Sequence, residues 1–281
     1  MVYILWNVIR PVLLSALSIF VTFQVLQPCA LWLDPSFNLL ASRGVGKVAF
    51  VTLVITHIFL LLIISAQSLW QKFLDSCIYF FWKEHWLKPF LTFFGLFFGL
   101  HAAILSGIVF GNVATFESGA FALNSIKIFS LAFGFFVTFL LAWSEELIFR
   151  GTLYQYFAQF ISPFSSALIT SLIFSLVHDL TCPWNLVTKD WKLGLGLFLL
   201  GLLLNLIFIV TGKLYTGMGV HAGLVYVKVV LRRLPLIVYG PTIPFWLDSD
   251  LRQSLLIHLF FALVIIGISI RYKKIIWPKK M

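Results

Sequence analysis

Residues 128–149 read IFSLAFGFFVTFLLAWSEELIF. No charged residue interrupts the run until Glu145 and Glu146, near its end. A helix that crosses the hydrocarbon core of a bilayer needs about 20 mostly apolar residues. The stretch therefore predicts a transmembrane helix that ends in an acidic pair.

Seven further stretches are apolar enough for the same interpretation, and with this one they predict an all-α, polytopic membrane protein with about eight transmembrane helices. They cover residues 11–33, 48–70, 89–113, 164–178, 193–210, 214–231 and 254–270. Ser162 and Pro163 precede one of them, and Pro suits the first turn of a helix. The stretch 152–161, which is rich in aromatic residues, is expected to form a separate helix at the membrane interface.

The composition excludes a water-soluble protein. Hydrophobic residues make up 61% of the 281 residues, charged residues only 11%, and the mean hydropathy is +1.02. The formal charge of +10 does not indicate nucleic acid binding, because no basic patch lies outside the apolar stretches and basic loops face anionic lipid headgroups. Three scattered cysteines form neither a disulfide framework nor a zinc-ligand spacing.

Charged groups inside an apolar run indicate function, because each costs at least about 2.5 kcal/mol at the centre of a membrane helix. Glu146 and Arg150 are four residues apart and share a helix face, so they are expected to pair, while Glu145 faces elsewhere. A second carboxylate in such a site is suited to act as a base. The pair alone is also consistent with a simple ion pair at a helix end.

Two histidines supply the partners that such a base needs. His178 ends one predicted span, and His221 lies within the Gly-rich span that also holds Gly217, Gly219 and Gly223. A carboxylate and two imidazoles on three helices are able to hold one water, which favours hydrolysis. Packing within a membrane helix is the alternative for His221, and a merely interfacial position at the span end is the alternative for His178. Packing is the interpretation we give to His57, His101, His258 and Asn205.

Three short motifs in this region resemble those of the CPBP family, the type II CAAX prenyl protease and bacteriocin-processing (Abi) intramembrane proteases. Residues 145–151, EELIFRG, resemble the first motif, Glu-Glu-x-x-x-Arg, and residues 174–178, FSLVH, resemble the second, Phe-x-x-x-His. His221 in GVHAG is similar to the histidine of the third. The resemblance implies a catalytic core at 128–231 within a single membrane domain, 1–281.

The resemblance also implies roles for the residues that carry it. Glu145 and His178 would activate a water, and His221 would stabilise the oxyanion. The supporting residues would be Glu146, Arg150 and Phe174. In many members an Asn or Asp follows the third-motif histidine by four positions, where this chain has Val225. That departure removes an oxyanion donor or marks a subgroup that uses another one.

Metal dependence stays open at this level. The cofactor is either a divalent ion such as zinc or none. If a metal is present, its ligands would be Glu145, His178 and His221, with an open fourth position. The chain has no His-Glu-x-x-His helix.

We therefore predict an intramembrane endopeptidase that cuts a membrane-associated peptide, with a prenylated CAAX-type tail as the substrate implied by the resemblance. Its partners would be the lipid bilayer and a membrane-associated peptide or lipidated protein, and not nucleic acid. The predicted location is the cell (inner) membrane, as a multi-pass protein. The alternatives are a proton-coupled transporter, in which Glu145 and His178 relay protons, and a catalytically silent scaffold.

Overall fold

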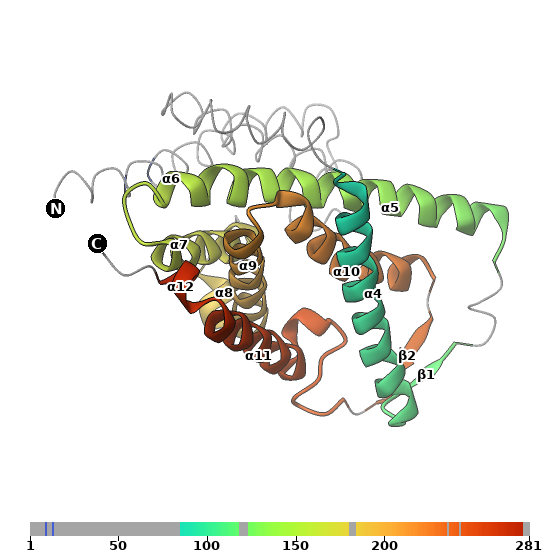
Figure 1. Ribbon diagram of the computed structural model, residues 1–281. Coiled ribbons are helices and arrows are strands. Elements are labelled where there is room, and N and C mark those ends of the chain that lie inside the picture. The colour runs from blue at the N-terminus through green and yellow to red at the C-terminus, as the bar shows by residue number, and fades with distance from the viewer. Residues whose placement is uncertain are drawn as a thin grey trace, which may run out of the picture. The chain divides into compact units, whose positions relative to one another are not determined.

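The computed structural model describes residues 9, 13, 85–117, 123–179, 184–234, 236–241 and 243–277. Residues 85–158 and 162–277 belong to one compact unit, whose helices are labelled in Figure 1. The predicted spans at 11–33 and 48–70 lie, apart from Leu13, outside the described residues.

The described unit is built almost entirely from helices. They are α4 (Leu87–Phe110), α5 (Ser125–Glu146), α6 (Gln155–Phe157), α7 (Pro163–Leu176), α8 (Asn185–Thr188), α9 (Trp191–Thr211), α10 (Leu214–Arg233), α11 (Leu255–Arg271) and α12 (Lys273–Ile276). A π-helix, η1 (Leu147–Tyr154), and two 3₁₀ helices, η2 (Val177–Asp179) and η3 (Leu251–Gln253), complete them. Two short strands, β1 (Ala114–Phe116) and β2 (Ile237–Tyr239), pair antiparallel after α4 and α10.

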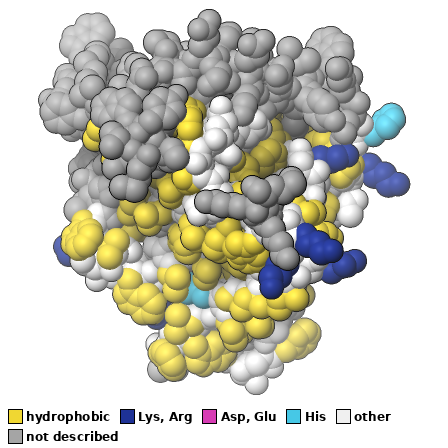
Figure 2. Space-filling view, turned by 60° about the vertical axis from the view of Figure 1, so that its left-hand side comes forward, with side chains coloured by type: hydrophobic (Ala, Val, Ile, Leu, Met, Phe, Trp, Pro, Cys, Tyr) yellow, Lys and Arg dark blue, Asp and Glu magenta, His cyan; other side chains and the backbone are white. Residues whose placement is uncertain are grey.

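Each predicted span within the described residues is a helix. Among the described residues, four segments are long and apolar enough to cross a bilayer: α4, Ser125–Phe157, α9 and Leu214–Leu231. α7 and α11 are shorter apolar helices. Figure 2 shows hydrophobic side chains across the described part of one face, with Lys and Arg side chains mainly towards its right-hand edge. The chain is an all-α polytopic membrane protein, as the composition predicts.

The prediction of a separate interfacial helix at 152–161 is wrong. α5 runs on through η1 into α6, so one helical segment covers Ser125–Phe157. Leu153, Tyr154 and Phe157 are buried rather than interfacial. The apolar side chains after Gly151 keep the chain in the helix, and the wider π turn changes the faces on which they lie. π turns of this kind occur often at functional sites.

Helix α10 packs against α4, α5 and α9, and Figure 1 shows it in the middle of these helices. Gly219 and Gly223 lie against α4: a Cβ atom would stand 2.5 Å from the Phe90 carbonyl oxygen at Gly219 and 2.6 Å from that of Phe94 at Gly223. The absence of side chains there lets the two backbones approach, as membrane helices often do.

Polar groups join other helices of the unit. The Asn205 amide on α9 donates to Ser171 Oγ (3.0 Å) and to the Ala167 carbonyl (3.3 Å) on α7, which confirms its predicted packing role.

At the start of α7, Ser162 Oγ accepts from the Ser165 amide, and Pro163 follows it as predicted.

The two packing histidines within the described residues are confirmed as hydrogen-bonded groups. His101, buried on α4, bonds to the backbone of Leu224, and His258 donates from Nε2 to the Arg252 carbonyl (2.8 Å). His57 lies outside the described residues.

The loop that leads from β2 into α11 is fixed by an ion cluster. Asp250 accepts from Lys228 Nζ on α10 and from the Arg252 guanidinium, each at 2.7 Å. The Arg252 carbonyl lies so close to Gly196 of α9 that a Cβ there would stand 2.0 Å from its oxygen. The loop is thus tied to both α9 and α10.

Asp250→Asn is expected to loosen this loop. Burial alone raises the pKa of the Asp250 carboxyl, but Arg252 and Lys228 outweigh burial and hold that pKa well below its ordinary value of 3.8. Ionised Asp250 therefore stabilises the folded loop above about pH 4, and this stabilisation is lost as the pH falls below that value. Hydrogen exchange of residues 244–254 should show faster opening of the loop at acid pH and, in Asp250→Asn, little further change with pH. Asp190→Asn, at an exposed carboxyl with no capping bond, should exchange like the wild type.

Candidate active site

The acidic pair lies where α5 passes into the π-helix. Glu145 is 8% exposed and Glu146 only 1%. Two carboxylates at this depth are stable only if other groups compensate their charges. Their surroundings therefore define the site.

Glu146 is held by a fully buried arginine. Arg150 donates from one terminal nitrogen to Glu146 Oε1 (3.0 Å) and from the other to the carbonyl of Gly201 on α9 (2.9 Å). The pairing that the spacing predicts is confirmed. The link to Gly201 shows that Arg150 also joins η1 to α9, so it is more than a helix-end ion pair.

His221 of α10 lies between the two carboxylates. Its Nδ1 is 3.1 Å from Glu146 Oε1, and its Nε2 is 3.6 Å from Glu145 Oε2. The sequence predicted that Glu145 and His221 converge, but it gave no sign that Glu146 also contacts the imidazole. The two carboxylates, Arg150 and His221 thus form one buried cluster of ionisable groups.

Phe174 and His178 approach the cluster from the end of α7. His178 lies on η2, and its Nδ1 is 2.6 Å from the Phe174 carbonyl, which only accepts, so Nδ1 carries the proton and Nε2 keeps its lone pair. The Phe174 ring centroid lies 4.7 Å from that of His178 and 6.0 Å from that of His221. The Arg150 guanidinium lies over the same ring at 5.0 Å.

These contacts bring all six predicted site residues into one region. Phe174 contacts both histidines and Arg150, and the charge of Glu145 acts on His178. His178 has no hydrogen bond to either carboxylate among those found in the described residues, so its link to Glu145 is through space. The arrangement gathers two carboxylates and two imidazoles in one region.

Two site residues were missed by the sequence analysis. Gly201 supplies the carbonyl that accepts from Arg150, and Gly217 leaves space for Glu146. Glycines in apolar helices give only a general signal of close packing. Val225, one turn after His221, is half-buried and has no side-chain donor.

The predicted metal ligands do not have the geometry of a metal site. Within the described ranges, no group of three His, Cys, Asp or Glu side chains is arranged to hold an ion. Both ring nitrogens of His221 face carboxylates, at 3.1 and 3.6 Å. The residues therefore do not fit a zinc ion held by Glu145, His178 and His221.

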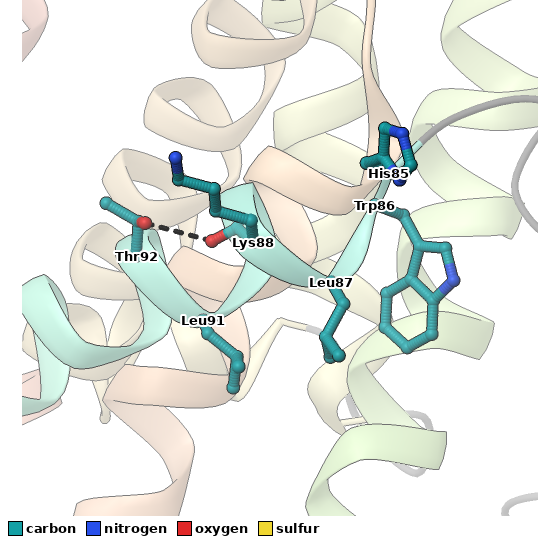
Figure 3. A pocket seen from close by; sticks show the side chains of 6 residues that line it. All are labelled: His85, Trp86, Leu87, Lys88, Leu91 and Thr92. Carbon is teal, nitrogen blue, oxygen red and sulfur yellow. Dashed lines mark hydrogen bonds between the residues drawn. The ribbon is translucent and has the colours of Figure 1, made fainter.

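A cavity of about 670 Å³ lies at the start of α4. Figure 3 shows its lining, with the Thr92 hydroxyl donating to the Lys88 carbonyl. The lining residues are His85, Trp86, Leu87, Lys88, Leu91 and Thr92. None of the six candidate site residues lines it.

Comparison with known protein families shows a similarity in the central part of the chain. Residues 127–227 match the family described as type II CAAX prenyl endopeptidase Rce1-like. Through this region the chain is similar to the CPBP family that the three motifs resemble. The matched part runs from α5 to α10 and includes every CPBP motif residue named above. Comparisons with curated proteins and with solved structures gave no match.

The match to this endopeptidase family indicates a membrane protease, with a lipid environment and a peptide substrate. The match and the apolar helices agree on an integral membrane protein. The CPBP resemblance seen in the three motifs is therefore confirmed at the level of the family.

Proposed function

We propose that the chain is an intramembrane endopeptidase that hydrolyses a peptide bond of a membrane-associated substrate. The observation that carries the proposal is the buried contact of His221 with both Glu145 and Glu146 inside membrane-spanning helices. A cluster of this charge density is costly in a bilayer and marks a functional site. A prenylated CAAX-type tail is the substrate class that the family suggests.

Glu145 is the general base of this mechanism. Its carboxylate takes a proton from a water that His178 Nε2 orients, and the resulting hydroxide adds to the carbonyl carbon of the peptide bond. The oxygen of the water is thereby bonded to the carbonyl carbon, and the former carbonyl oxygen carries the negative charge. Glu145 then returns the proton to the amide nitrogen as the carbon–nitrogen bond breaks, which gives a carboxylic acid and an amine.

His221 stabilises the oxyanion. Its Nδ1 lies against Glu146 and its Nε2 lies on the side of Glu145. The mechanism requires Nε2 to carry the proton that it donates to the oxyanion. A fixed donor in a site without bulk water is more effective than one in water, because it needs no reorientation as the charge develops. Val225 supplies no second donor, so this imidazole is the principal one on α10.

The remaining three residues position the site. Arg150 holds Glu146 in place and links it to α9. The Phe174 ring contacts the guanidinium and both imidazoles, and the Phe174 carbonyl accepts from Nδ1 of His178. We place the protein in the cell (inner) membrane, with 128–231 as the catalytic core of a single membrane domain.

Peptide cleavage by the purified protein tests this function. The wild-type chain in detergent or liposomes is incubated with matched lipidated and unlipidated peptides, and products are identified by mass spectrometry. We expect internal cleavage that favours the lipidated peptides and an unchanged rate after chelator treatment. A rate that falls on chelation and returns with zinc would contradict the metal-free mechanism.

The same experiment separates the alternative functions. A transporter would carry protons in liposomes without cutting any peptide, and that result would contradict the protease. A silent scaffold would show neither cleavage nor flux.

A further inference from the structure

Gly217 of α10 lies against the Glu146 carboxylate. A Cβ atom at this position would stand 2.9 Å from Glu146 Oε2 and 3.6 Å from its Cδ. The glycines that follow it, Gly219 and Gly223, instead face the backbone of α4. Close packing of α10 on α4 therefore explains those two glycines and not Gly217.

The Glu146 carboxylate has little freedom to move away from Gly217. Its Oε1 accepts from Arg150 and lies 3.1 Å from His221 Nδ1. Its Oε2 is buried and has no hydrogen-bond partner among the described residues. A shift that relieved a contact at Oε2 would lengthen the two contacts at Oε1.

Gly217 and His221 are one helical turn apart on α10 and so share a face. Glu146 contacts this face at both positions, with Oε2 on the glycine and Oε1 on the imidazole. The position of the carboxylate against the glycine thus sets where the imidazole is held relative to Glu145.

We propose that Gly217 is a positioning residue: the space that its missing side chain leaves admits the Glu146 carboxylate between α5 and α10 and so fixes His221 beside Glu145. The kinetic part of the proposal rests on the proposed protease function. Gly217 does not contact the substrate in this mechanism, so a side chain at this position lowers kcat and leaves KM unchanged. Displacement of a catalytic group by about 1 Å costs about 10²-fold in rate, which is the loss expected for Gly217→Ala.

A second substitution tests whether Gly217 acts through Glu146. In Glu146→Asp the carboxylate is drawn back by one methylene, which frees the space that the methyl group introduced by Gly217→Ala would need. Each single variant should lose kcat, and the double variant Gly217→Ala/Glu146→Asp should recover about tenfold over Gly217→Ala, as coupled neighbours do. A double variant whose losses simply multiply would overturn the proposal.

Two glycine variants serve as matched controls. In Gly219→Ala the new Cβ meets the Phe90 carbonyl, so stability falls and Glu146→Asp should give no recovery. Gly267→Ala on α11 meets nothing within 4 Å and should behave as the wild type. Recovery of Gly219→Ala by Glu146→Asp would show a general effect and contradict the specific one.

Thermal unfolding gives a readout that needs no activity. The melting temperatures of the wild type, the two single variants and the double variant should show the same recovery as kcat. If the wild type cuts no peptide while this recovery is seen, the protease function fails and the positioning role stands. If Gly217→Ala does not fold, return of folded protein in the double variant supports the proposal, and its absence overturns it.

Discussion

Glu145→Gln is expected to lower kcat by about 10²–10⁴-fold while the protein stays folded. The amide has the shape of the carboxylate but cannot accept the proton of the attacking water. Glu145 Oε2 has no hydrogen-bond partner among the described residues, and Glu145 takes no part in the Arg150 ion pair. Within the described part of the chain, its one ionic contact is the longer one to His221 Nε2, at 3.6 Å, so its charge should contribute less to stability than that of Glu146. The measurements are kcat on a lipidated peptide and the melting temperature in detergent.

Glu146→Gln is the matched control, because it changes the neighbouring residue in the same way. It weakens the contacts with Arg150 and His221 at once, so both kcat and the melting temperature should fall. The two adjacent carboxylates are thus distinguished by stability as well as by rate. Wild-type kcat in Glu145→Gln would exclude Glu145 as the base.

Arg150→Met is expected to have the largest effect on folding. The arginine is fully buried, and its removal leaves the Glu146 charge without its compensating cation. Removal of one partner of a buried ion pair costs about 3–5 kcal/mol. The bond to the Gly201 carbonyl and the contact with the Phe174 ring are lost with it. Thermal unfolding of the purified variants measures this loss.

Two further variants identify the cause of that loss. Arg150→Lys keeps the charge, but a single ammonium cannot reproduce the fork that reaches both Glu146 and Gly201, so its loss should be intermediate. Arg150→Met/Glu146→Gln removes both charges and should be more stable than Arg150→Met alone. Arg150→Met with the wild-type melting temperature would refute the role of this pair.

The sequence predicts well whatever depends on local periodicity. The apolar runs gave the described spans, Ser162 and Pro163 gave the start of α7, and the four-residue spacing gave the Glu146–Arg150 pair. Each of these follows from the geometry of one helix, which residue spacing specifies directly.

The sequence predicts poorly what depends on the register between helices. Contact of His221 with Glu146 requires α10 to present Gly217 and His221 together to the end of α5, and no pattern within either helix specifies that. The continuation through η1 was missed because Arg150 and Gly151 look like a helix end. In the structure Arg150 donates hydrogen bonds to Glu146 and to the Gly201 carbonyl, so its charge is compensated inside the unit and the helix continues past it.

The catalytic roles of Glu145, His178 and His221 stay predictions. Their arrangement supports them in one respect that motifs alone do not: the tautomer that Phe174 imposes leaves the lone pair of His178 on Nε2. An imidazole in that state accepts a hydrogen bond from water, as the proposed mechanism requires.

A double-variant measurement of kcat tests most directly whether Glu145 and His178 act on the same water. Single-turnover cleavage of one lipidated peptide is compared for the wild type, Glu145→Gln, His178→Ala and the double variant. Groups that act as a unit give strongly non-additive losses, so the double variant should be no slower than the slower single variant. Losses that multiply in the double variant, or cleavage at the wild-type rate in both single variants, would contradict a shared catalytic water.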